Sequence, residues 1–85
     1  MYSVDISKRA VKDILGLPTP MIVRIHAAIR SLSLDPRPSG CKKLVDSKKP
    51  LWRIRVGDYR VAYTVDDVVR VVEVRKVGHR KDIYL

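Results

Sequence analysis

LWRIRVGDYRVAYTVDDVVRVVEVRKV, residues 51–77, is the stretch of sequence that decides the fold. Apolar residues dominate it, and many of them are β-branched, which is typical of strands. Turn signals at Gly57-Asp58 and Asp66-Asp67 divide it into predicted strands at roughly residues 51–56, 59–65 and 68–77. Because the turns are short, these strands are expected to form an antiparallel meander, one face of which needs a cover.

The residues before this stretch predict a further strand and a first helix. Residues 2–6 alternate between apolar and polar side chains, as a half-buried strand does. Ser7 is a suitable N-cap for a helix that stops at Gly16 and Pro18. The apolar stripe of this helix is expected to consist of Val11, Ile14 and Leu15.

A second helix is predicted to begin with Thr19 as its N-cap. Pro20 then occupies the first helical position, where a missing N–H costs nothing. Apolar residues recur at spacings of three and four, so one side of the helix packs and the other faces water. The packing positions are Met21, Ile22, Ile25, Ala28, Ile29 and Leu32.

These elements predict an α+β fold with the order β-α-α-β-β-β. Two N-terminal helices cover one face of an antiparallel sheet of four strands, or of five if the apolar pair Leu44 and Val45 forms a short strand in the basic loop 36–50. A chain of 85 residues suffices for one domain but not for two, so residues 1–85 are expected to form a single domain.

The charge of the chain is strongly positive and unevenly distributed. There are 18 Lys and Arg against 9 Asp and Glu, which gives a net charge of +9, and 13 of the 18 basic residues lie after residue 35. An anionic partner that binds the second half of the chain is therefore expected.

The sequence has a single cysteine and shows no leader signal. Cys41 is alone, so no internal disulfide is expected, and no cluster of ligands around it indicates a metal or another cofactor. The N-terminus has no apolar leader region, and no apolar run is long enough to span a membrane. We expect a cytoplasmic protein with no metal, no cofactor and no membrane partner.

Alternation along the predicted strands places arginines on the face away from the helices. In residues 51–56 the apolar side chains share one face, and Arg53 and Arg55 share the other. The same reasoning puts Arg60 on the open face of the next strand. Arginine binds phosphate through paired hydrogen bonds, so nucleic acid is the expected ligand class. RNA cleavage needs cations around the phosphate and groups that move protons, which Arg, Lys, His and Tyr can supply.

The runs LWRIRVGDYRVAYTV and VRVVEVRKVGHRKDIYL resemble the RelE/ParE superfamily of toxin–antitoxin systems. The specific elements are W-R-I-R-x-G-x-Y-R-x-x-Y and the ending V-G-H-R-K-x-x-Y, and the resemblance extends over nearly the whole chain. It implies a twisted antiparallel sheet with helices on one face. In the RelE-like branch it also implies an endoribonuclease that enters the ribosomal A site and cuts messenger RNA, without a metal, by attack of the 2′-OH.

The resemblance also assigns roles to individual residues. Arg60 matches the phosphate-stabilising arginine, Arg80 a second arginine and Tyr84 the C-terminal tyrosine, while His79 occupies a position filled by Lys or His. Arginine is a poor proton donor or acceptor, so His79 and Tyr84 are the candidates for proton transfer. The expected RNA-binding residues are Arg53, Arg55, Lys42, Lys43 and Lys81.

Other conspicuous side chains are better explained by packing. Trp52, Tyr59 and Tyr63 share the core-facing parity of their strands, and His26 borders the packing stripe of the second helix. None of the four is included in the candidate site.

Two other functions remain open. A ParE-like toxin would share the fold but inhibit DNA gyrase, and a regulatory relative would bind RNA without cutting it. Either toxin implies an antitoxin, expected to be acidic and partly disordered, that wraps the basic surface. The other expected partners are the ribosome and messenger RNA, with DNA reached only through the antitoxin.

Overall fold

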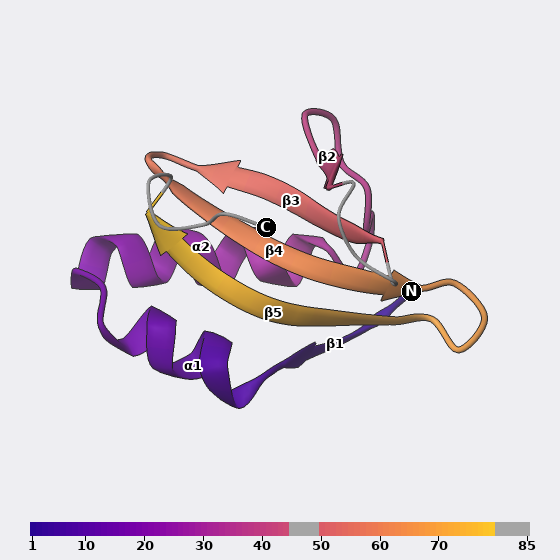
Figure 1. The fold of residues 1–85 in the computed structure, drawn as a ribbon, viewed down its shortest axis with the longest axis horizontal. Helices are drawn as coiled ribbons and strands as arrows, with labels where there is room; N and C mark the ends of the chain where they lie inside the picture. The colour runs from indigo at the N-terminus through magenta and orange to yellow at the C-terminus, as the bar shows by residue number, and fades with distance from the viewer. Residues whose placement is uncertain (45–49, 80–85) are drawn as a thin grey trace.

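The computed structural model describes residues 1–44 and 50–79, and the elements of these residues follow the predicted order (Figure 1). The strands are β1 (Ser3–Ile6), β2 (Lys42–Leu44), β3 (Leu51–Val56), β4 (Tyr59–Asp66) and β5 (Val71–His79). The helices are α1 (Lys8–Leu15) and α2 (Thr19–Ser31). The α+β fold class is confirmed, and the short strand near Leu44 makes the sheet five-stranded. None of the helices in the described residues is long and apolar enough to cross a membrane.

The sheet has the spatial order β1-β5-β4-β3-β2, and it is mixed rather than wholly antiparallel. β3, β4 and β5 form the predicted antiparallel meander, and β2 joins its outer edge. β1, however, lies parallel to β5, with Val4 opposite Val72 and Ile6 opposite Val74. The prediction of an antiparallel sheet was therefore wrong for this one pair. Alternation shows which side chains of a strand are buried, but it does not give the direction of a neighbour that comes from the other end of the chain.

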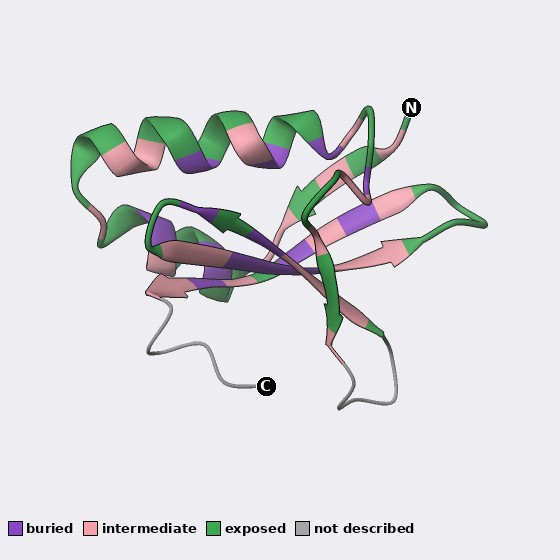
Figure 2. Ribbon diagram, turned by 90° about the horizontal axis from the view of Figure 1, so that it is seen from above, coloured by how far each residue is buried: buried purple, intermediate pink, exposed green. Residues whose placement is uncertain are grey.

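Both helices contribute to one core. α2 runs behind the sheet in Figure 1, and α1 lies beside the last half of β5, while Figure 2 shows the twist of the strands beneath α2. Tyr63, which is 0% exposed, is the largest fully buried side chain, so its predicted packing role is confirmed. The other large, fully buried members of the core are Ile25, Ile29, Leu32, Val61, Val72 and Val74.

α1 is capped as predicted but turned differently about its axis. The Ser7 hydroxyl accepts a hydrogen bond from the Ala10 N–H at 3.1 Å. Ala10 and Ile14 are buried, whereas Val11 and Leu15 are 42% and 73% exposed, so the predicted stripe was wrong at these two positions. Ser7 is the cause, because its N–H donates to the Val74 carbonyl and pins the start of the helix to β5.

Two further boundaries differ from the prediction. Pro18 is the N-cap of α2, so Thr19 is its first residue and Pro20 its second. This shift is harmless because N–H groups throughout the first helical turn have no partner in the helix. β5 begins at Val71 rather than at residue 68, because Asp66 accepts hydrogen bonds from the N–H groups of Val68 and Val69 and folds them into a turn.

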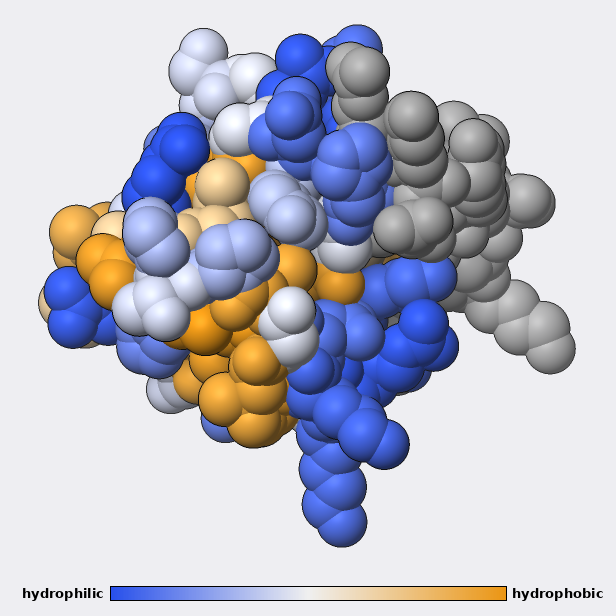
Figure 3. Space-filling model, turned by 90° about the vertical axis from the view of Figure 1, so that its left-hand side faces the viewer, coloured by the Kyte–Doolittle hydropathy of each residue, from blue (hydrophilic) through white to orange (hydrophobic). Residues whose placement is uncertain are grey.

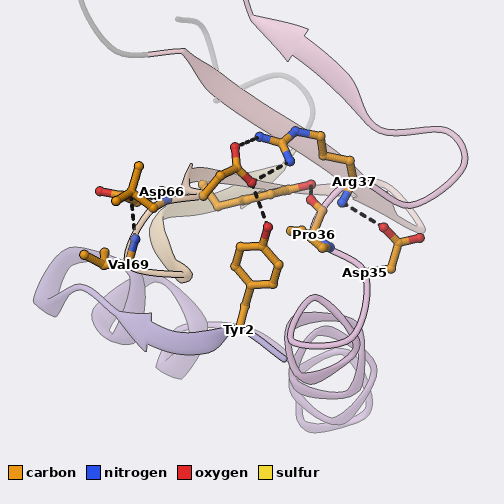
Figure 4. A network of polar contacts seen from close by, with 9 residues as sticks. Tyr2, Asp35, Pro36, Arg37, Asp66 and Val69 are labelled. Carbon is orange, nitrogen blue, oxygen red and sulfur yellow. Dashed lines mark hydrogen bonds and ion pairs between the residues drawn. The ribbon is translucent and has the colours of Figure 1, made fainter.

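A polar network closes the end of the molecule that holds this turn (Figure 4). Asp67 accepts hydrogen bonds from the Tyr2 hydroxyl at 2.7 Å and from both terminal nitrogens of Arg37 at 3.1 and 2.8 Å. The Arg37 guanidinium also lies 4.9 Å from the centre of the Trp52 ring. Close by, the Tyr63 hydroxyl donates to the Pro36 carbonyl at 2.7 Å. The network joins the residue before β1, the α2–β2 loop and the β4–β5 turn.

Acid should weaken this network, because hydrogen bonds from Arg37 and Tyr2 lower the pKa of Asp67 from 3.8 to about 2. A carboxylate with a lowered pKa contributes stability that is fully present above its ordinary pKa and is lost as the pH falls through the lowered one. We expect the melting temperature of the wild type to fall more steeply below pH 3.8 than that of Asp67→Asn. Equal slopes in thermal scans across this range would contradict this role of Asp67.

Candidate functional site

The sheet face opposite α2 carries two rows of residues in which cations predominate. Arg60 of β4 lies between Arg55 of β3 and Gly78 of β5. The second row lies two residues further along each strand and consists of Lys42, Arg53, Ala62 and Lys76. Neighbouring strands are about 4.8 Å apart, so long side chains in adjacent rows can reach one phosphate. The predicted grouping of Arg53, Arg55 and Arg60 on one face is confirmed.

The arginines of this face repel one another. The pKa of Arg53 is lowered from its ordinary value, first by partial burial and then by the charges of Arg60 and Arg55. The folded protein therefore holds like charges close together at an energetic cost. A bound polyanion would relieve this repulsion, as is typical of a surface that binds nucleic acid.

Two residues in the middle of the face are small. Ala62 is buried and Gly78 has no side chain, and these two residues lie side by side with the cations of both rows. A phosphate bound on this face would therefore meet the long cationic side chains that surround these two residues.

A β-bulge adds a cation that sequence reasoning missed. Tyr63 lies opposite Val74 but Ala62 lies opposite Lys76, so β5 has one extra residue, Arg75, at this point. Val74 and Val77 are both buried, which leaves Lys76 on the open face beside Ala62. The signal in the sequence is the pair of basic residues between two core valines, which breaks strict alternation.

His79 lies on the other face of the sheet from Arg60. It is opposite Tyr59, and the two rings meet edge to face with their centres 5.6 Å apart. Tyr59 packs against the core, so the structure does not bring His79 together with the arginines. The other residues expected from the C-terminal tail, Arg80, Lys81 and Tyr84, lie outside the described residues.

The two lysines predicted to bind RNA from the basic loop, Lys42 and Lys43, lie on opposite faces of the sheet. Lys42 lies opposite Arg53 and belongs to the open face. Lys43 lies opposite Trp52, and its ammonium nitrogen is 6.0 Å from the centre of that ring. Lys43 therefore contributes to the packing around Trp52 rather than to the rows of cations.

A groove of about 510 Å³ continues the basic face around the outer edge of β3. Lys42, Arg53 and Arg55 line it from the sheet, and Ala28 and Ser31 line it from the last turns of α2. Nothing in the sequence indicated that these small helix residues line a groove.

A view from the end that holds the α1–α2 connection shows hydrophobic residues over that end and hydrophilic residues toward the side of the open face (Figure 3).

Comparisons with known proteins identify relatives of this chain. Residues 4–84 match the family described as the ParE toxin of the type II toxin–antitoxin system parDE. The putative toxin RelE1 of Methanocaldococcus jannaschii is 33% identical, over 98% of this chain and 94% of its own length. The toxin RelG of Mycobacterium tuberculosis is 32% identical, over 98% of this chain and 95% of its own length.

Solved structures show the same fold. The archaeal RelE–RelB complex of Pyrococcus horikoshii OT3 contains a chain with a TM-score of 0.83 and 31% identity, covering 96% of this chain and 98% of that one. A chain of the toxin–antitoxin complex RelBE2 of Mycobacterium tuberculosis has a TM-score of 0.82 and 28% identity, covering 93% and 98%. The family match and the relatives agree along almost the full length of the chain. This protein therefore belongs to the RelE/ParE superfamily of toxins from type II toxin–antitoxin systems.

Proposed function

We propose that this toxin is a ribosome-dependent endoribonuclease, an mRNA interferase that cuts messenger RNA in the ribosomal A site and so stops translation. The observation that carries the proposal is the pair of cation rows on the open face, with Arg53, Arg55 and Arg60 around the small residues Ala62 and Gly78. Such a face positions a phosphate and stabilises the charge that builds on it during cleavage.

In the proposed reaction the 2′-OH attacks the adjacent phosphorus without a metal. The products are a 2′,3′-cyclic phosphate and a 5′-OH. Arg60 stabilises the pentacoordinate phosphate, and Arg80 is proposed as the second stabilising cation. Tyr84 is the preferred acceptor of the 2′-OH proton, because His79 lies on the other face of the sheet and because a tyrosine can act as a base where cations lower its pKa. Lys42 and Lys81 are proposed to hold the RNA backbone.

The partners follow from the same surface. We propose that an acidic, partly disordered antitoxin covers the basic face, since two structurally similar toxins were solved in complexes with an antitoxin. The proposed compartment is the cytoplasm, where ribosomes and messenger RNA are present. DNA would be reached only through the antitoxin.

The decisive experiment supplies purified toxin to ribosomes that hold a defined messenger. We expect cleavage within the A-site codon, with cyclic phosphate and 5′-OH ends. Cleavage should persist with a chelator of transition metals that leaves the ribosomal Mg²⁺ in place. The same messenger without ribosomes is the control and should remain intact. Intact messenger on ribosomes with every A-site codon would rule out the proposal.

A second candidate, inhibition of DNA gyrase, is favoured by the family match, which names a ParE toxin. A supercoiling assay separates the two functions. Loss of gyrase activity together with intact messenger would support the ParE-like function. A third function, RNA binding without turnover, would give neither result.

A further inference from the structure

The bulge in β5 places Lys76 directly beside Ala62 and next to the row of Arg60, whereas Lys42, the other lysine of this face, lies at its far edge on β2. We infer that Lys76 is the general acid that protonates the leaving 5′-oxygen. This inference rests on the proposed function and assigns one of its proton transfers to a residue that the sequence pattern did not indicate.

The position of Lys76 follows from the register. It is the direct cross-strand neighbour of Ala62, and Arg60 and Gly78 form the adjacent row. Diagonal neighbours on a sheet face are about 7–8 Å apart between their backbones, which long side chains easily span. The ammonium of Lys76 and the guanidinium of Arg60 can therefore reach the same phosphate from neighbouring strands.

α1 holds the backbone of the bulge in place. The Ser7 hydroxyl donates to the Arg75 carbonyl at 3.2 Å, and the Val77 N–H donates to the Asp13 carboxylate at 3.1 Å. Val74 is the last residue of β5 that pairs with β1. Beyond it, these two bonds give the backbone of β5 the hydrogen-bond partners that β1 no longer supplies. The residue between them, Lys76, is thus fixed on the open face by contacts made from the opposite side of the strand.

Chemistry distinguishes Lys76 from its neighbours. A guanidinium, with a pKa above about 12, holds its proton too firmly to give it up readily, whereas the ammonium of a lysine is charged at neutral pH and can release a proton. Arg75, the other cation of the bulge, forms an ion pair with Glu73 at 2.7 Å. Among the described residues no carboxylate is in ion-pair distance of Lys76, so its ammonium is available for RNA.

The proposed step balances. The bond between the 2′-oxygen and phosphorus forms while the bond between phosphorus and the 5′-oxygen breaks. The 5′-oxygen takes a proton from the Lys76 nitrogen, and the 2′-OH proton passes to the base, with water as its final acceptor. The neutral amine then recovers a proton from solvent, and the enzyme is restored.

A substrate with sulfur in place of the 5′-bridging oxygen tests this role, because a thiolate leaves without being protonated. On ordinary messenger in ribosomes, Lys76→Ala should slow single-turnover cleavage by about 100-fold or more, the usual loss for a general acid. Lys76→Arg should remain slow although it keeps the charge. On the sulfur substrate both variants should approach the wild-type rate, whereas Arg60→Ala should remain slow on both substrates.

Arg75→Ala is the matched control, since it removes a positive charge from the adjacent position of the bulge. It should cleave both substrates at nearly the wild-type rate. If Lys76→Ala is fully active, or is equally slow on both substrates, the inference is wrong while the proposed function stands. If the sulfur substrate instead restores a Tyr84→Phe variant, the tail tyrosine is the donor and Lys76 is not. If the wild type cleaves neither substrate, the proposed function itself fails, and the role of Lys76 fails with it.

Discussion

Replacing Arg60 with alanine should lower ribosome-dependent cleavage by about 100- to 1,000-fold, or roughly 3 kcal/mol of transition-state stabilisation, as for loss of one preorganised donor. The reason is its position, because Arg60 lies at the centre of the open face between Arg55 and Gly78. The paired N–H groups of its guanidinium match two phosphate oxygens as negative charge accumulates on them. The measurement is the single-turnover rate at saturating ribosome concentration, which separates chemistry from binding.

Two further variants serve as controls for this test. Arg60→Lys keeps the charge but loses the planar fork, so its rate should fall between those of the wild type and Arg60→Ala. Arg30→Ala removes an exposed arginine from α2 and should leave the rate unchanged. If Arg60→Ala weakens only the binding of RNA and leaves the saturated rate intact, Arg60 does not stabilise the transition state.

Replacing Tyr63 with alanine should destabilise the fold by about 3–5 kcal/mol, as is usual when a buried aromatic ring is removed from a core. The ring is 0% exposed, and its hydroxyl ties β4 to the α2–β2 loop through the Pro36 carbonyl. A domain of this length has a free energy of unfolding of only roughly 4–13 kcal/mol, so the variant should be close to unfolding. Urea denaturation, followed by the fluorescence of Trp52, measures the loss directly.

Tyr63→Phe separates the hydroxyl from the ring. It leaves the Pro36 carbonyl without this donor and should cost about 1–3 kcal/mol. Val69→Ala, which shortens a side chain that is 65% exposed, should change the free energy of unfolding by less than about 0.5 kcal/mol. A Tyr63→Ala variant as stable as Val69→Ala would show that the core does not depend on this ring.

Burial also explains why Tyr63 has no place in the proposed chemistry. Desolvation raises its pKa well above the ordinary value, and the neighbouring Cys41 contributes in the same direction. A tyrosine held in its neutral form inside the core accepts no proton from a substrate. Tyr63 is therefore no alternative to Tyr84 as the proposed base.

Much of the fold could be predicted because buried residues recur at a regular spacing, every second residue in a strand and every three or four residues in a helix. The alternation of Arg53, Ile54 and Arg55 identified the open face, and the positions of Ile25 and Ile29 identified the packed side of α2. The helix rotation of α1 could not be predicted in this way, because a helix of eight residues is too short for its stripe to outweigh the bonds that Ser7 makes to β5.

The sequence by itself determined the charge, the alternating strands and therefore the basic face of the sheet, since these properties depend on neighbours only one or two residues apart. The tertiary structure decided the parallel pairing of β1, the placing of His79 beside Tyr59 and the placing of Lys76 on the open face beside Ala62. Each of these depends on contacts between segments distant in sequence. A single extra residue in β5 reverses the facing of all that follow it, and only the partner strand and the support from Ser7 and Asp13 determine where that residue is accommodated.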